Sequence, residues 1–337
     1  MISGTRGRRF ARSAFYAATA AVVAWAALVV PLPVVEYVPG SPTSIPELIE
    51  LEGITSYPLE GDTLLLTVLL RQQPTVPAVG AVLSTERSLV PYRDVFPPGI
   101  DRDEVRLVER ERFARQFDVA VAVGAAAAGV DTELITEVVV VQVLPGSPAD
   151  GVLTPGDVVL AVDGEPLASA EELQARSRTG QVGERLRLTI RHTGVERDVE
   201  VELAAFGGVA EPRMGIAIET AVDEARLPFE VALREGTRIG GPSAGLMVGL
   251  TVYDLLTEDS LLAGRIVAGT GSLDADGRVG PVGGIPSKLI AARDEGAELV
   301  LVPRLQLELA LDAAPEGLEV VGVDHLDEAI AVLSGGA

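Results

Sequence analysis

The chain lacks cysteine altogether and holds only two histidines, and aromatic residues make up 4% of its 337 residues. Without cysteine the protein cannot use disulfides, thiolate metal ligands or a cysteine nucleophile. Two histidines leave little for a zinc site or a Ser-His pair. Apolar residues nevertheless account for 47% of the chain. We therefore expect folded domains with aliphatic cores, and the length fits two or three of them.

Lysine is almost absent too, since Lys288 is the only lysine among 27 basic residues. Acidic residues number 49, which gives a net charge of −22 and argues against binding to nucleic acid. An arginine stays protonated in a protein, whereas a lysine can lose its proton and act as a base. The single lysine is therefore either a leftover surface charge or a group that is kept for its chemistry.

The N-terminus combines positive charge with a long apolar run. An arginine-rich tail, residues 1–12, precedes residues 13–35, which carry no charge and are long enough to cross a bilayer as a helix. Positive charge before the helix predicts a single-pass protein of the cell membrane, with its N-terminus in the cytoplasm and residues 36 onward outside. A cleaved signal peptide is the alternative, because residues 24–26 (Ala-Trp-Ala) fit a small-x-small cleavage site.

Residues 36–133 contain short apolar runs separated by proline and glycine, which predict strands. Residues 101–129 add helix formers with opposite charges at helical spacing. We attach no chemistry to this region. We expect a β-rich membrane-proximal spacer with one helix.

Residues 134–204 are rich in predicted strands, with one amphipathic helix near residues 169–176. The run VLPGSPADGVLTPGDVVLAVDGEPL in this segment resembles a PDZ domain of the kind found in bacterial protease-associated proteins. The resemblance implies a β-domain that captures an extended polypeptide by adding it as a strand.

Ser243 lies where a glycine-rich turn leads into an apolar helical run. Backbone N–H groups at the start of a helix can stabilise an oxyanion, and small residues let a substrate backbone approach closely. Ser243 is therefore a candidate nucleophile, with Gly241, Ala244 and Gly245 around the reacting carbonyl. An ordinary N-cap serine is the alternative, and a serine hydroxyl also needs a base to take its proton.

Lys288 follows a glycine pair and a proline and has apolar neighbours on a predicted helix. Burial among such neighbours would lower the pKa of its ammonium group from about 10.4 toward neutrality, where a lysine serves as a general base. Ser243 lacks a base and Lys288 lacks a nucleophile, so each residue supports the interpretation of the other.

The motifs GGPSAGL and GTGSLDADGRVGPVGGIPSKLIAA resemble the proteolytic domain of the Lon family, and we assign this domain to residues 212–337. In that family a serine and a lysine form a catalytic dyad. The resemblance thus implies Ser243 as nucleophile, Lys288 as base and Thr270 as the threonine that orients the lysine. It also implies an α/β fold for this domain and assembly into a homo-oligomer.

With its N-terminal segment and its PDZ-like region, the chain resembles the membrane-anchored PDZ-Lon peptidases of bacteria, which implies an α+β multidomain protein. We therefore predict an ATP-independent serine endopeptidase that cleaves exported or membrane-associated polypeptides and uses no cofactor. A Walker A loop needs a lysine, and the only one lies in another motif. We expect no metal either, since residues 274–277 predict a hairpin turn with too few ligands for a calcium loop. A non-catalytic PDZ scaffold with a Lon-like fold is the alternative.

Overall fold

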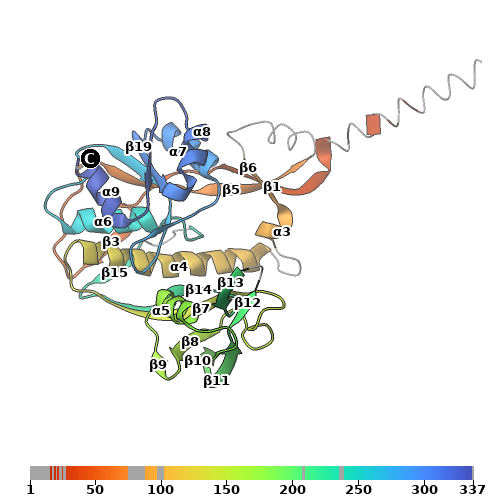
Figure 1. Cartoon of the computed structure of the whole chain (residues 1–337). Helices are drawn as coiled ribbons and strands as arrows, with labels where there is room; N and C mark the ends of the chain where they lie inside the picture. Colours follow the sequence, from red (N-terminus) through yellow and green to blue (C-terminus); the bar gives the residue numbers. More distant parts are fainter. Residues whose placement is uncertain are drawn as a thin grey trace, which may run out of the picture.

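A computed structural model describes residues 28–74, 88–96, 102–206, 209–234 and 239–335 and positions 16, 19, 21, 22 and 25, without the side chains of 102–104, 108 and 209. These residues form two modules, and the long helix α4 of the larger one lies next to the smaller one (Figure 1). We call residues 133–226 the inserted module, and the segments on both sides of it, 31–127 and 230–335, the main module. The helices are α3 (Tyr92–Val95), α4 (Arg102–Ala127), α5 (Ala170–Thr179), α6 (Gly245–Leu256), α7 (Ile285–Asp294), α8 (Leu307–Ala313) and α9 (Leu326–Leu333), with a 3-10 turn at Arg304–Gln306.

The central sheet of the main module mixes strands from the two ends of the chain. Its order is β2 (Thr43–Ser44), β4 (Asp62–Leu65), β16 (Ile266–Gly269), β19 (Leu299–Pro303) and β20 (Glu319–Val323). Strand β4 pairs in parallel with β16, and Leu64 stands opposite Ala268. Residues 36–133 and 212–337 therefore share one sheet, which corrects the expected division into a spacer and a separate catalytic domain.

Helix α4 packs against α6 and completes the same core. Phe113 and Phe117 of α4 belong to one buried cluster with Leu246 and Leu250 of α6. The two backbones touch at a pair of glycines, because a Cβ atom added to Gly124 would lie 2.3 Å from the carbonyl oxygen of Gly249. The alanine-rich end of α4 is thus a helix-packing surface.

A three-stranded arm projects from the main module beside α3 (Figure 1). Its strand order is β5 (Val68–Pro74), β1 (Pro31–Pro39) and β6 (Ser88–Pro91). The arm is fixed to α7 by a hydrogen bond, in which the Ser287 hydroxyl donates to the carbonyl oxygen of Tyr37 over 2.7 Å. This bond joins the start of the chain to the helix that carries Lys288.

Strand β1 corrects the end of the helix expected at residues 13–35. Pro31 and Pro33 cannot continue a helix because they lack the backbone N–H. Val35 is 1% exposed and pairs with β5 on one side and β6 on the other. Residues 1–12 and ten of the 23 residues of the expected helix lie outside the described residues. Within the described part of the chain, no helix is both long and apolar enough to cross a membrane.

The main module also contains two short strand pairs. Strand β3 (Ile49–Glu52) pairs with β15 (Glu230–Leu233), which precedes the Ser243 region in the chain. Strands β17 (Ser272–Leu273) and β18 (Val279–Gly280) form a hairpin, and residues 274–277 make the turn that the sequence predicted.

The inserted module has its own sheet and its own core. The sheet order is β11 (Val195–Glu202), β10 (Arg185–His192), β8 (Val158–Val162), β7 (Glu133–Val143) and β14 (Ile216–Arg226), with β9 (Glu165–Pro166) beside β8. A hairpin of β12 (Ala204–Phe206) and β13 (Val209–Arg213) precedes β14. The buried cluster draws only on residues 138–218. The module thus continues past the expected limit at residue 204 and closes where Arg226 pairs with Glu133.

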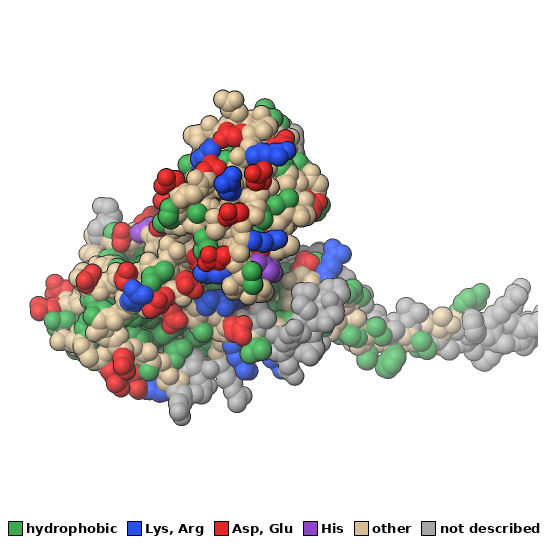
Figure 2. Space-filling model, turned by 90° about the horizontal axis from the view of Figure 1, so that it is seen from below, with side chains coloured by type: hydrophobic (Ala, Val, Ile, Leu, Met, Phe, Trp, Pro, Cys, Tyr) green, Lys and Arg blue, Asp and Glu red, His purple; other side chains and the backbone are tan. Residues whose placement is uncertain are grey.

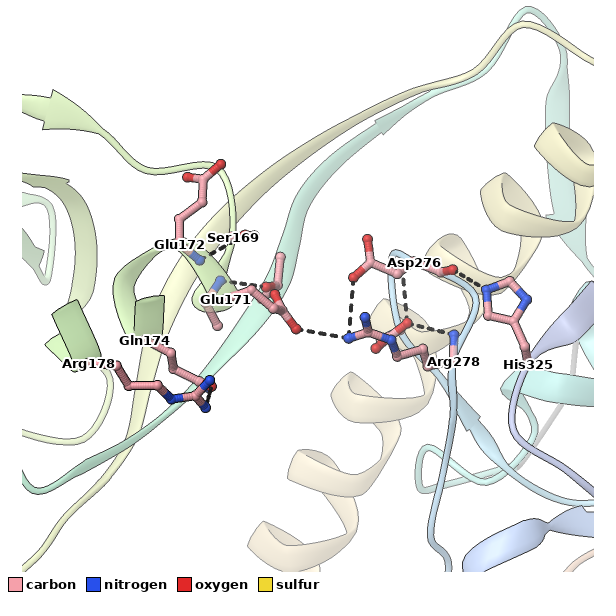
Figure 3. A network of polar contacts seen from close by, with 11 residues as sticks. Ser169, Glu171, Glu172, Gln174, Arg178, Asp276, Arg278 and His325 are labelled. Atoms are coloured by element: carbon pink, nitrogen blue, oxygen red, sulfur yellow. Dashed lines mark hydrogen bonds and ion pairs between the residues drawn. The ribbon is translucent and has the colours of Figure 1, made fainter. Parts of the chain in front are cut away.

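A polar network joins the inserted module to the β17–β18 hairpin (Figure 3). Arg278 of the hairpin donates to Glu171 of α5 over 2.9 Å. The ring nitrogen Nε2 of His325 lies 2.6 Å from the carbonyl oxygen of Asp276 and holds the same hairpin on α9. The two modules therefore meet at exposed charges as well as along α4.

Candidate active site

Ser243 lies in the turn that precedes α6, as the sequence predicted. Gly241 has a φ of +86°, a left-handed backbone conformation that favours glycine, and α6 begins at Gly245. The carbonyl oxygen of Ser243 accepts two hydrogen bonds, from the N–H of Gly271 (3.0 Å) and from the Thr270 hydroxyl (3.2 Å). The backbone of the candidate nucleophile is thus fixed by the segment that follows β16.

Lys288 is buried in the first turns of α7, with 2% of its surface exposed. Its Nζ atom donates to the Thr270 hydroxyl over 2.7 Å. Burial lowers the pKa of Lys288 from 10.5 to about 7, because the ammonium form loses its hydration. A substantial share of this amine is therefore neutral near pH 7 and able to accept a proton.

Thr270 connects the two residues. Its Oγ1 atom accepts from Lys288 and donates to the carbonyl oxygen of Ser243. No hydrogen bond joins the Ser243 hydroxyl directly to Lys288 Nζ, although both residues are described and line the same cleft. Hydrogen bonds between catalytic groups are often long without substrate and tighten when it binds.

The cleft has a volume of about 1340 Å³, and its walls come from segments far apart in the sequence. The arm strands β1 and β5, helix α3 and the first half of α4 face the Ser243 turn and residues 281–283 across it. The sequence analysis assigned no chemistry to the arm or to α4. Their role as cleft walls could not be predicted because these segments carry no motif, and the sequence signal for them is indirect. The glycine pair before Lys288 indicates only that some other segment approaches closely.

The side chain of Tyr37, on β1, lies close to this glycine pair. A Cβ atom added to Gly283 would lie 3.0 Å from the Tyr37 hydroxyl oxygen, and one added to Gly284 would lie 3.2 Å from the tyrosine ring. Burial raises the pKa of Tyr37, and the negative charge of Glu109 raises it further. Tyr37 therefore stays a neutral hydroxyl in the wall beside the lysine helix.

Glu109 of α4 supports the Ser243 turn from the opposite side. Its carbonyl oxygen accepts the N–H of Gly241 over 2.9 Å. Its carboxylate is close enough that a Cβ atom on Gly241 would lie 3.3 Å from it. A side chain at position 241 would thus crowd Glu109 as well as strain the backbone.

The three small residues expected around the reacting carbonyl lie in different places. Gly241 lines the cleft, whereas Ala244 and Gly245 do not. Ala244 is 5% exposed and belongs to the core. A Cβ atom on Gly245 would lie 2.7 Å from the backbone nitrogen of Leu273, so this glycine is needed for packing.

The family model for the Lon protease (S16) C-terminal proteolytic domain matches residues 213–334. This part of the chain is Lon-like. The Lon-like match includes Ser243, Thr270 and Lys288, but the arm strands lie before it. The model of the PDZ domain matches residues 105–203, which begins inside α4 and ends before β14.

Curated Lon proteases match part of the chain. The Lon protease of Clostridioides difficile is 39% identical over 94 residues, which cover 27% of this chain and 12% of that protein. The Lon protease of Azorhizobium caulinodans is 34% identical over 131 residues, which cover 38% and 15%. The chain thus spans only 12% to 15% of the length of these relatives. Among solved structures, the PDZ domain of an SdrC-like protein from Listeria innocua is 26% identical and has a TM-score of 0.24, with 24% of this chain and 92% of that one covered.

Proposed function

We propose that the chain is a serine endopeptidase in which Ser243 is the nucleophile and Lys288 the general base. The observation that carries the proposal is the Lys288–Thr270–Ser243 connection at the wall of an open cleft, with a lysine whose pKa burial lowers to about 7. Lys288 has no acidic partner among the residues that the structure describes. A buried lysine of this kind is costly to the fold, and a general base is a reason to keep one.

In the proposed reaction Lys288 Nζ takes the proton of the Ser243 hydroxyl while the serine oxygen bonds to the peptide carbonyl carbon. The resulting ammonium group then gives a proton to the leaving amine as the C–N bond breaks. Water attacks the acyl-serine ester in the second half, and its proton returns through Lys288 to the serine oxygen. Thr270 fixes the position of the lysine in both halves.

The oxyanion would lie at the start of α6. The backbone N–H groups of Ser243 and Ala244 have no hydrogen-bond acceptor among the described residues. The N–H of Gly245 already faces the carbonyl oxygen of Pro242 at 3.4 Å. We therefore assign the stabilising donors to Ser243 and Ala244, aided by the positive end of the α6 dipole.

The inserted module would hold part of the substrate. Strand β14 is an outer strand of its sheet and runs beside α5, where the N–H of Ala170 donates to the Thr220 hydroxyl over 2.9 Å. An extended polypeptide could add to the free edge of this strand, the binding mode of PDZ domains. Because this chain contains no Walker A loop, the proposal includes cleavage without ATP, and therefore of polypeptides that are already unfolded.

The location of the protein and its assembly are further parts of the proposal that rest on the sequence. The basic tail and the apolar run that follows it favour a membrane anchor with the cleft outside the cytoplasm. Extraction of cell membranes at high pH tests the anchor, and light scattering of the purified chain tests the homo-oligomer. Recovery of the full-length chain in the soluble fraction would remove the anchor from the proposal.

Cleavage of a labelled, unfolded polypeptide by the purified full chain tests the peptidase, with and without ATP and a chelator. We expect turnover by the parent and by the control Ser334→Ala, and a loss of about 10³-fold or more in Ser243→Ala and Lys288→Arg. Lys288→Met serves beside the arginine variant because it fits the buried space. Turnover by a folded Ser243→Ala or Lys288→Met variant would exclude the dyad. No turnover by the folded parent would favour the scaffold.

A further inference from the structure

The described residues that line the cleft beside Ser243 include more basic than acidic side chains, opposite to the balance of the whole protein. Acidic side chains spread over the face of the molecule drawn in Figure 2, with basic side chains among them, and the chain as a whole carries −22. Among the described residues, two acidic ones line the cleft, Asp94 and Glu109. The described arginines that line it number four: Arg71, Arg106, Arg110 and Arg112.

Both acidic residues of the cleft already have a basic partner. Glu109 pairs with Arg112 over 2.9 Å, and Asp94 lies 3.6 Å from Arg93, which is outside the cleft lining. Neither Arg71 nor Arg110 has an ion pair with any described residue. Among the described residues, Arg71 and Arg110 thus line the cleft without a carboxylate partner.

Helix α4 holds this charge at the edge of the Ser243 turn. The Glu109 carbonyl oxygen binds the N–H of Gly241 over 2.9 Å, so Arg110 follows directly after the residue that contacts the turn. The helix itself is fixed against α6 in the core. The Arg110 guanidinium group is thus carried by a rigid element beside the candidate nucleophile.

An aliphatic surface accompanies the charge. Leu69 and Leu70 of β5 line the cleft and are 61% and 43% exposed. A ligand that satisfies both surfaces is an extended polypeptide with aliphatic and acidic side chains close together in its sequence. Guanidinium groups bind carboxylates in a two-point geometry that a neutral side chain cannot match.

We propose that the cleft selects polypeptide segments with acidic side chains near the bond to be cleaved, and that Arg110 is a main determinant of this preference. This inference rests on the proposed peptidase function. Attraction at exposed groups falls with ionic strength, so the preference decreases as salt rises.

The test compares three C-terminally amidated fluorogenic peptides. They differ only at two positions next to a leucine, and both positions are Asp in the first peptide, Asn in the second and Lys in the third. For the full chain at low ionic strength we expect kcat/KM to be about fivefold to tenfold higher for the Asp peptide than for the Asn peptide, and lowest for the Lys peptide. Arg110→Glu should reverse the order. The matched control Arg115→Glu, an exposed position of α4 outside the cleft lining, should retain it.

Equal kcat/KM for the three peptides, or a preference that Arg110→Glu leaves unchanged, would overturn the inference. The Asn peptide with a free C-terminus separates the effect of a side-chain carboxylate from that of a terminal carboxylate. A rise in kcat/KM that is seen only with this peptide would also overturn the inference. If the folded parent cleaves none of the peptides, the peptidase proposal fails. The charge preference is then tested by fluorescence anisotropy as binding of the same peptides to Ser243→Ala, where the same order supports it and equal affinities overturn it.

Discussion

The two modules differ in how the chain builds them. The inserted module uses one continuous stretch, residues 133–226, and its buried cluster contains no residue from outside that stretch. The main module combines segments from both ends of the chain, and β4 lies between β2 and β16 in its central sheet. A continuous module can be recognised and removed as a unit, whereas an interleaved one exists only when all of its segments are present.

Fragments of the chain provide the largest expected difference between the modules. Residues 128–228 alone should fold, because they contain the whole core of the inserted module. Residues 212–337 alone should not, because they lack β4 and α4 and leave the core open on two sides. Circular dichroism and thermal melting measure the outcome. A cooperative transition in the 212–337 fragment would show that the core of the main module folds without β4 and α4.

The second expected difference between the modules is the pH dependence that Lys288 gives to the stability of the main module. The inserted module contains no lysine. The pKa of Lys288 is about 7 in the folded chain, against an ordinary value of 10.5 that applies to the unfolded chain. Between these two pH values the unfolded chain therefore binds one proton more than the folded chain. Stability from this group therefore rises with pH from about 7 to 10.5 and is lowest at pH 7 and below. Lys288→Met should stabilise the chain at pH 7 by on the order of 3 kcal/mol, with a smaller gain at higher pH.

Thermal melting between pH 6 and pH 10 measures this gain, and Arg185→Met in the inserted module serves as the exposed control. The same pKa predicts that kcat/KM of the parent rises about tenfold per pH unit below 7 and levels off above it. A gain in stability that does not change with pH would contradict the assignment of the shift to Lys288.

Thr270 distinguishes a hydroxyl of the site from a hydroxyl of the core. Thr270→Val removes the hydrogen bonds to Lys288 and to Ser243, so kcat should fall by about tenfold to a hundredfold and the pH profile should shift. Thr251→Val removes a buried hydroxyl that bonds Thr63 and the Met247 carbonyl. Both variants should lose about 1–2 kcal/mol of stability, but only the first should move the pH profile. Equal pH profiles in the two variants would reduce Thr270 to a packing role.

The contact between the modules should give the smallest effect. Glu171 and Arg278 are more than half exposed, so a double-mutant cycle with Glu171→Gln and Arg278→Gln should give a coupling energy of about 0.2–1 kcal/mol. Glu196→Gln, exposed on β11, is the control for loss of one acidic charge. A much larger coupling energy would mean that the two modules unfold as one unit.

The candidate site was predictable from sequence where its residues lie in local motifs. Ser243, Thr270 and Lys288 all come from the segment that follows the inserted module, and the structure brings them together through two hydrogen bonds of Thr270. The strands expected within residues 134–204, among them β10 and β11, were predicted for a similar reason, because alternation of apolar and polar residues is a local pattern.

The walls of the cleft were not predictable from local pattern. The carbonyl of Tyr37 binds a serine 250 positions later, and nothing in the sequence near either residue indicates the partner. Residues 31–35 are apolar but form the start of strand β1, and this composition extended the expected helix too far. Long-range pairing of this kind is fixed by the whole core rather than by the residues that pair.

The position of β4 in the central sheet also determines when the cleft beside Ser243 can form during synthesis. Strand β4 leaves the ribosome more than 200 residues before its parallel neighbour β16, since their first residues are 62 and 266. The inserted module is complete by residue 226 and can fold while the main module still waits for its partner strands. Lys288 and its helix come later still. A nascent chain can thus carry the folded inserted module before Ser243 and Lys288 can come together at the cleft, so the proposed activity would not act on the unfinished chain.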